Sequence, residues 1–238
     1  MYVLLSAALL PAALLFLYIL RQDPQPEPPK ELIKAVLAGI GICIPVIFVE
    51  GAVEALLFGG EVQAGTLLDA GAQAFLVAAL PEEGFKLLAL WWVLRRNPYF
   101  DEHFDGIVYA VCVGLGFAAV ENVMYVFQNV DAWQSVALSR ALLAVPGHYA
   151  FAVLMGYYYS IYHFVSRTPR TAACVLLAPV LAHGIYDTLA FSGQIDAYIG
   201  SIGFVVLIYF CIKLQKIAQR KVAAQIQRDR NEQPFDQA

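Results

Sequence analysis

The feature that most constrains this chain is its series of long apolar stretches. Seven of them approach or exceed the roughly 20 residues that a helix needs to cross the hydrocarbon core of a bilayer. Backbone polar groups inside a bilayer must bond within the chain, so such stretches are expected to be helical. They lie at 2–20, 32–58, 67–94, 105–129, 139–165, 171–191 and 198–215. The sequence therefore predicts an all-α, polytopic integral membrane protein with about seven transmembrane helices.

The composition supports this prediction. Hydrophobic residues make up 60% of the chain and charged residues 14%, whereas soluble domains have about 45–50% and about 25%. The net charge of −4 gives no reason to expect nucleic acid as a partner. We expect one membrane-embedded domain over residues 1–215, followed by a basic cytoplasmic tail, 216–238, that is frayed or disordered.

The positions of lysine and arginine predict the orientation in the membrane. Thirteen of the 15 lie on one side: in or beside the linker 21–31, near residue 95, near 167–170 and around the tail. With seven spans, this places the N-terminus outside and the C-terminus in the cytoplasm. The two exceptions are Lys86, inside the third stretch, and Arg140, which is close enough to the end of its stretch to reach the interface.

Four consecutive stretches contain polar side chains near mid-membrane or in the outer half. Each is costly in lipid unless it has a partner. They are Glu82, Glu83, Lys86, Glu121, Asn122, His148, His183 and Asp187. Either glutamate before Lys86 can pair with it on one helix face, which leaves the other carboxylate in need of a second partner.

Together these eight residues predict a shared hydrated cavity. A carboxylate in such a cavity can act as a general base on water, and two histidines with carboxylates can alternatively bind a divalent metal. The chain has no HExxH zinc motif. We expect Glu50 and Glu54 on a wet outer surface or at the rim of the cavity, and we interpret Asp105 as a helix cap.

At these residues the chain resembles a known protein family. "PEEGFK" at 81–86 is similar to the EExxK motif of that family, and "FDGIVYAVCVGLGFAAVEN", "GHY" and "HGIYD" are similar to its later motifs, in the same order. The family is the PrsW type of polytopic membrane proteases, related to the type II CAAX-prenyl proteases, and the resemblance covers roughly 75–191. It implies peptide-bond hydrolysis in or near the bilayer. Members are associated with the first cleavage of membrane-anchored anti-sigma factors, which implies a bacterial inner-membrane location and a membrane-anchored protein as substrate.

The resemblance also implies roles for the polar residues. The catalytic residues would be Glu82, Glu83, His148 and His183, one glutamate activating water while the histidines orient it, polarise the carbonyl or bind a metal. The supporting residues would be Lys86, Glu121, Asn122 and Asp187. Two cofactor alternatives stay open: none, or a divalent metal such as zinc held by Glu83, Glu121, His148 and His183.

Two other classes of function also stay open at this point. A non-catalytic membrane scaffold would keep the polar cluster for helix assembly, but it has little use for a second mid-membrane carboxylate. A proton or ion transporter would use Glu82, Glu83 and Lys86 as a relay. No internal repeat of the kind common in transporters is visible in the sequence, which counts against this alternative.

Overall fold

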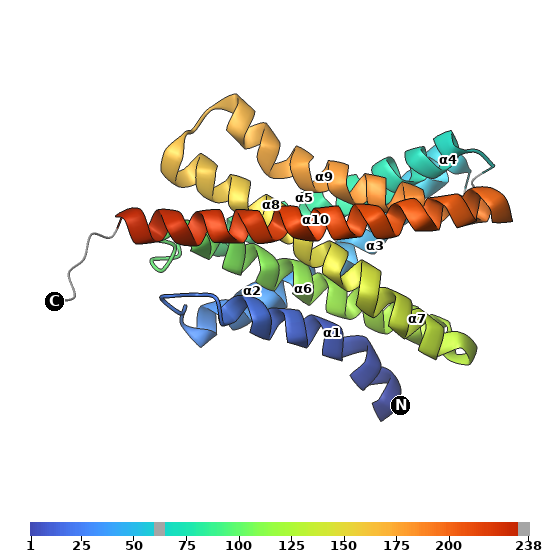
Figure 1. The fold of residues 1–238 in the computed structure, drawn as a ribbon, viewed down its shortest axis with the longest axis horizontal. Helices are drawn as coiled ribbons and strands as arrows, with labels where there is room; N and C mark the ends of the chain where they lie inside the picture. The colour runs from blue at the N-terminus through green and yellow to red at the C-terminus, as the bar shows by residue number, and fades with distance from the viewer. Residues whose placement is uncertain (60–64, 233–238) are drawn as a thin grey trace.

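A computed structural model describes residues 1–59 and 65–232. These residues form ten α-helices without any strand, joined by π-helical and 3₁₀ turns and short loops (Figure 1). The α-helices are α1 (Tyr2–Leu20), α2 (Pro29–Gly41), α3 (Cys43–Phe58), α4 (Leu67–Ala72), α5 (Leu80–Leu94), α6 (His103–Gln128), α7 (Trp133–Ser139), α8 (Val145–Ser160), α9 (Pro169–Phe191) and α10 (Ala197–Glu232). The all-α prediction is confirmed.

Six helical segments of the described chain are long and apolar enough to span a bilayer. They are Tyr2–Leu20, Pro29–Phe58, His103–Gln128, Val130–Val165, Pro169–Gln194 and Ala197–Glu232. Residues 67–94 are helical throughout as well, but they carry Glu82, Glu83 and Lys86 in their interior and are not among these six. The multi-pass membrane architecture is thus confirmed, while the seventh crossing and the orientation of the termini stay predictions.

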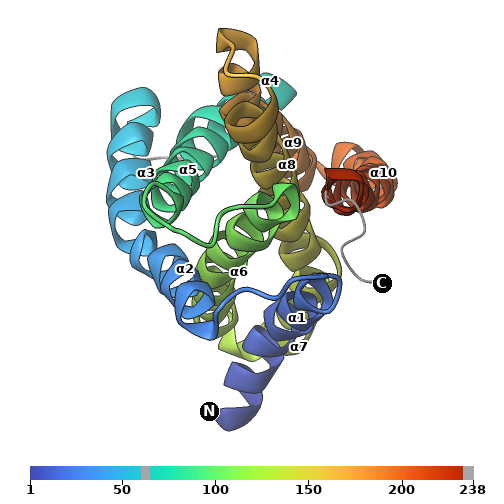
Figure 2. The same ribbon diagram turned by 90° about the vertical axis from the view of Figure 1, so that its left-hand side faces the viewer.

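Helix α6 lies at the centre of the bundle, with α1 and α2 packed on one side of it and α8 on the other (Figure 2). Small residues allow this close packing: a Cβ added at Gly114 would lie 2.8 Å from the Cβ of Ala152 on α8. Cβ atoms at Gly39 and Gly116 would meet the backbones of α6 and α2, respectively. Such contacts are typical of membrane helices, whose backbones approach where side chains are absent.

Two π-helical segments precede the prolines at the starts of α5 and α8. Segment η1 (Gln73–Ala79) comes just before Pro81, and η3 (Arg140–Ala144) comes just before Pro146. Proline has no N–H, and its ring clashes with the carbonyl four residues earlier, so a widened turn is a favourable way to accommodate it. Glu82 and His148 follow these prolines by one and two residues, at the point where α-helical geometry resumes.

Helix α10 continues to Glu232 without a break at residue 216. In Figure 1 it runs along the whole length of the molecule. Buried side chains recur every three or four residues over its second half: Leu214, Ala218, Val222, Gln225 and Asp229. The expectation of a frayed tail is therefore wrong for residues 216–232, because this regular apolar face packs onto the bundle. Residues 233–238 lie outside the described residues, and the division of the chain at 215 stays a prediction.

Buried carboxyl groups gather where the linker between α1 and α2 meets the start of α6. We call Asp23, Glu27, Asp105 and Asp229 the linker-end cluster. Asp229 accepts the first two backbone N–H groups of α6 at 2.7 and 2.8 Å. Asp105 accepts the backbone N–H of Glu102 at 2.7 Å, so its predicted capping role is confirmed. The Tyr109 hydroxyl donates to Glu27 at 2.6 Å. The cluster thus ties the linker and the end of α10 to the N-terminus of α6.

Candidate active site

Lys86 lies at the centre of the polar residues and is almost completely buried. Its ammonium group donates to Glu82 Oε2 at 2.9 Å, to Glu83 Oε1 at 2.8 Å and to His148 Nδ1 at 3.2 Å. All three of its N–H donors therefore have partners, which offsets much of the cost of burying the charge. The sequence predicted an ion pair with one glutamate, and the structure shows that Lys86 joins both.

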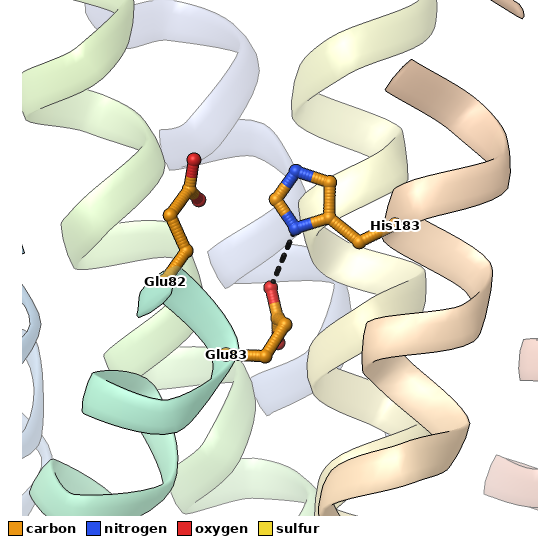
Figure 3. Close-up of side chains that lie close together, drawn as sticks. All are labelled: Glu82, Glu83 and His183. Carbon is orange, nitrogen blue, oxygen red and sulfur yellow. Dashed lines mark hydrogen bonds and ion pairs between the residues drawn. The ribbon is translucent and has the colours of Figure 1, made fainter. Parts of the chain in front are cut away.

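The two adjacent glutamates of α5 point in different directions (Figure 3). Glu83 is completely buried, and its Oε1 also lies 3.0 Å from Nδ1 of His183. The other oxygen of Glu83 has no hydrogen-bond partner within the described residues. Glu82 instead lines a cavity. Glu82 thus faces the cavity, while Glu83 bonds to Lys86 and His183 in the interior of the bundle.

His183 on α9 is fixed from three sides. Its Nδ1 faces Glu83, and its Nε2 lies 3.1 Å from Asp187 Oδ2. The imidazole also stacks on Phe151, with ring centroids 4.7 Å apart and 16° between the planes. Since both ring nitrogens face carboxylate oxygens, satisfying both requires a proton on each nitrogen or on one of the carboxyl groups. The orientation of this ring is therefore strongly determined.

His148 on α8 bridges α5 and α6. Its Nδ1 faces the ammonium of Lys86, and its Nε2 lies 2.7 Å from Glu121 Oε2. An ammonium group can only donate, so Nδ1 must accept, and Nε2 then carries the proton that is donated to Glu121. This assignment follows from the partners on either side of the ring.

Arg140, at the start of η3, completes the network. Its Nη2 lies 2.8 Å from Glu121 Oε2, and its Nε donates to Asn122 Oδ1. Asn122 in turn donates to the backbone carbonyl of Ala8 on α1 at 2.7 Å. The expectation that Arg140 reaches the interface is wrong, because Glu121 and Asn122 offer it charged and polar partners inside the bundle. Arg140 and Lys86 are the two basic residues that do not follow the cytoplasmic charge pattern. This exception was the signal in the sequence that could have revealed Arg140 as a member of the buried network.

One cavity of about 740 Å³ joins these side chains. Its polar lining includes Glu82, Glu121, Arg140, His148, His183 and Asp187. Glu50 and Glu54 of α3 also line it, which agrees with the second of the two positions expected for them. The lining extends to Gln128 and Phe191, at the ends of α6 and α9. The structure thus brings all eight residues selected from the sequence into one network, five of them on the cavity wall, while their catalytic roles stay predictions.

A possible metal-binding group differs from the predicted one. Within residues 1–59 and 65–232, three ligand atoms lie within 4.8 Å of one another in Glu82, Glu83 and His183 (Figure 3). The predicted set shares Glu83 and His183 with this group but did not contain Glu82. It contained instead His148, whose Nδ1 bonds to Lys86, and Glu121, which bonds to the far side of the His148 ring. Two carboxylates and an imidazole suit a divalent ion such as zinc. The unpartnered Oε2 of Glu83 is a further free ligand atom, so these residues fit a metal.

The fold and the site together define a class of protein. Carboxylates and imidazoles from membrane-embedded helices face one cavity, as acid–base chemistry inside a bilayer requires. A family model described as "PrsW family intramembrane metalloprotease" matches residues 27–214. The chain belongs to this family and is a membrane-embedded protease.

Curated relatives agree with this assignment over nearly the whole chain. A "Protease PrsW" of Geobacillus kaustophilus is 32% identical, with 93% of both chains covered. Proteins of the same name from Halalkalibacterium halodurans and Bacillus subtilis are 30% and 32% identical, covering 96% and 79% of this chain and 100% and 82% of their own. No solved structure shows a significant match. The predicted hydrolase activity and multi-pass membrane location are confirmed, and the scaffold and transporter alternatives are set aside.

Proposed function

We propose that this protease hydrolyses a peptide bond of a membrane-anchored protein by means of a water molecule that Glu82 activates. The observation that carries the proposal is the division between the two glutamates: Glu82 lines the cavity, whereas Glu83 is completely buried behind it. A general base must be within hydrogen-bonding reach of the water that it deprotonates. Of the two carboxylates, Glu82 is therefore the one placed to contact such a water.

The other polar residues would position this base and stabilise charge. Lys86 holds one oxygen of Glu82 and leaves the other for the water. Glu83 would act as a positioning residue through Lys86 and His183. His148 and His183 both line the cavity, where an imidazole N–H could donate to the oxygen that gains negative charge as the carbonyl is attacked. Either ring must then exchange one of its present partners for the substrate.

A divalent metal is compatible with the same site. Glu82, Glu83 and His183 would hold it, with the free oxygen of Glu83 as an additional ligand atom. When bound, such an ion would supply a Lewis acid that polarises the scissile carbonyl. Lys86 already bonds to both carboxylates. Its ammonium would therefore share these oxygens with the metal or move aside.

We further propose a membrane-anchored anti-sigma factor as the substrate, with cleavage near the outer surface. The resemblance of the motifs supports the class of substrate. The cavity lining supports the side, because it includes the last residues of α6 and α9. Both helices finish at the end of the bundle that holds the N-terminus (Figure 1). The positive-inside pattern predicts that this end is outside. A single-span protein could present an unwound segment to the cavity from there.

The test is cleavage of single-span substrates, anti-sigma factors among them, by the purified full chain in detergent. We expect Glu82→Gln to lower kcat by about 10³-fold or more, in the range of a lost general base. Glu83→Gln should lower it less, by about 10- to 100-fold, as for a residue that acts through its neighbours. Glu31→Gln, which alters an ion pair with Lys34 at the other end of the bundle, is the matched control. Wild-type cleavage by Glu82→Gln would refute the proposal.

A second measurement decides the metal question independently of the residue roles. Elemental analysis of the purified protein, and of Glu82→Gln and His183→Ala, would report whether a metal binds and whether these residues hold it. Full activity after stringent chelation, with no metal found, would leave the glutamate-activated water alone. Metal at about one equivalent in the wild type and its loss from both variants would support the metal-assisted form.

A further inference from the structure

Arg140 lines the cavity and has no role in the mechanism above. It lies on η3, eight residues before His148, and its side chain is only 11% exposed. Its guanidinium bonds to Glu121 and Asn122 and lies over the Tyr125 ring, 4.1 Å from the centroid. A guanidinium can make several such contacts at once because its donors form a rigid planar fork. Arg140 is therefore a fixed positive charge beside the cavity.

The partner of Arg140 is also the partner of a proposed catalytic residue. The same oxygen of Glu121, Oε2, lies 2.8 Å from Arg140 Nη2 and 2.7 Å from His148 Nε2. On its opposite edge, His148 accepts from Lys86. The ring is thus held between Lys86 and Glu121, and Glu121 in turn forms an ion pair with Arg140.

We propose that Arg140 is a positioning residue of the active site, which holds Glu121 in the place from which Glu121 orients the His148 ring. This inference rests on the proposed function, in which His148 faces the substrate. Without Arg140, the Glu121 carboxylate would lose its cationic partner while remaining in a largely buried place. It would then be free to turn toward the cavity and its water. The His148 ring would lose the acceptor that fixes one of its two nitrogens.

Two other roles for Arg140 are compatible with its contacts. As a cavity-lining cation, it could bind the substrate directly. Through Asn122 and the Ala8 carbonyl, it could also act only as a clamp between α1 and α6. The three roles predict different kinetics, which makes them separable. A positioning role changes kcat, a substrate contact changes KM, and a clamp changes the unfolding temperature alone.

The experiment compares Arg140→Met, Glu121→Gln and the double variant with the wild type, using a single-span substrate at 25 °C. We expect Arg140→Met to lower kcat by about 10- to 100-fold, as for other residues that orient a catalytic group, with KM within about twofold. Because Arg140 acts through Glu121, the double variant should be no slower than Glu121→Gln alone. Guanidinium at millimolar concentration should restore part of the activity of Arg140→Ala. Arg95→Met, which removes an exposed arginine stacked on Trp91, is the control and should keep wild-type kinetics.

The outcomes separate this inference from the proposed function. Wild-type kcat in Arg140→Met, together with loss of cleavage in His148→Ala, would overturn the inference and leave the proposed function intact. Wild-type cleavage by His148→Ala would overturn the role of His148 and the inference with it. A rise in KM alone, or independent losses that multiply in the double variant, would also overturn the positioning role. Should Arg140→Met fail to fold, Arg140→Lys and the guanidinium rescue of Arg140→Ala carry the same comparison.

Discussion

The cavity and the linker-end cluster stabilise buried carboxyl groups in different ways. Around the cavity, the carboxylates bond to side-chain cations and imidazoles, as Glu83 does to Lys86 and His183. In the linker-end cluster, Asp105 and Asp229 accept backbone N–H groups at the start of α6. Backbone donors at a helix N-terminus are immobile and stabilise the fold. Ammonium, guanidinium and imidazole groups can exchange partners, so the cavity is the region equipped for chemistry.

The largest effect is expected when Lys86, the cation at the centre of the site, is removed. Lys86→Met leaves Glu82 and Glu83 buried without their ammonium partner, so we expect a loss of about 3–5 kcal/mol of stability, together with loss of cleavage. Thermal unfolding in detergent measures the first effect. Adding Glu83→Gln to Lys86→Met should recover part of the stability, because one uncompensated charge is removed. An unchanged unfolding temperature in Lys86→Met would contradict the claim that Lys86 stabilises the two buried glutamates.

The corresponding test at the other end is Asp229→Ala, which removes two hydrogen bonds from the start of α6. We expect a loss of about 1–2 kcal/mol, the usual cost of a helix cap. The kcat of the folded protein should not change, since this cluster is proposed to be structural. Unfolding and cleavage are measured on the same sample. A large fall in kcat well below the unfolding temperature would show that the contrast between the two regions is too simple.

An effect of similar size is expected from Tyr109→Phe, which removes the hydroxyl that donates to Glu27. Loss of one hydrogen bond to a buried acceptor costs about 1–3 kcal/mol at most and is often near the lower value. Tyr99→Phe is the matched control, because Tyr99 is exposed near the same end of the bundle. Unfolding temperatures of the two variants give the comparison. Equal values would mean that the Tyr109 hydroxyl contributes nothing to anchoring the linker.

The last test is the pH dependence that arises from one group, Asp23 in the linker. Burial raises the pKa of Asp23 from 3.8 to about 6 in the folded protein. A raised pKa means that the folded state binds the proton more tightly, so the stability from this group is lost as pH rises from about 4 to 6. Asp23→Asn should therefore gain stability relative to the wild type across this window and keep a constant advantage above it. Unfolding temperatures at pH 4, 5, 6 and 7 provide the measurement, and an advantage that shrinks as pH rises would contradict it.

The sequence predicted the all-α, multi-pass architecture and eight of the residues that meet around the cavity. A helix that crosses a bilayer must be apolar over most of its length, so the spans stand out. Polar residues such as Glu82 and His183 stand out within them for the same reason. All eight residues chosen in this way meet in one network, and the glutamate pair, Lys86 and the histidines needed no knowledge of the fold to be selected.

What the sequence did not provide depends on helix rotation and on long-range packing. Whether Glu82 or Glu83 faces the cavity follows from how α5 is turned against α9. The partner of Arg140 follows from the contact between η3 and α6. The second half of α10 looked like a solvated tail, because its buried positions, such as Ala218 and Val222, are spaced among charged residues. That these positions pack against α6 and α8 is visible only in the folded bundle.

The π-helical segments before Pro81 and Pro146 have a consequence for the spacing of the chain. A turn with i→i+5 bonding holds one more residue than an α-helical turn, which rotates everything upstream by about 100°. Removing a single residue from 73–79 would therefore rotate α4 and Gln73 about the helix axis relative to Glu82 on α5, so that they would face different neighbours. The number of residues in each helical segment before its proline thus determines which side chains of that segment face the cavity. Single-residue deletions in these stretches should alter the site far more than most substitutions there.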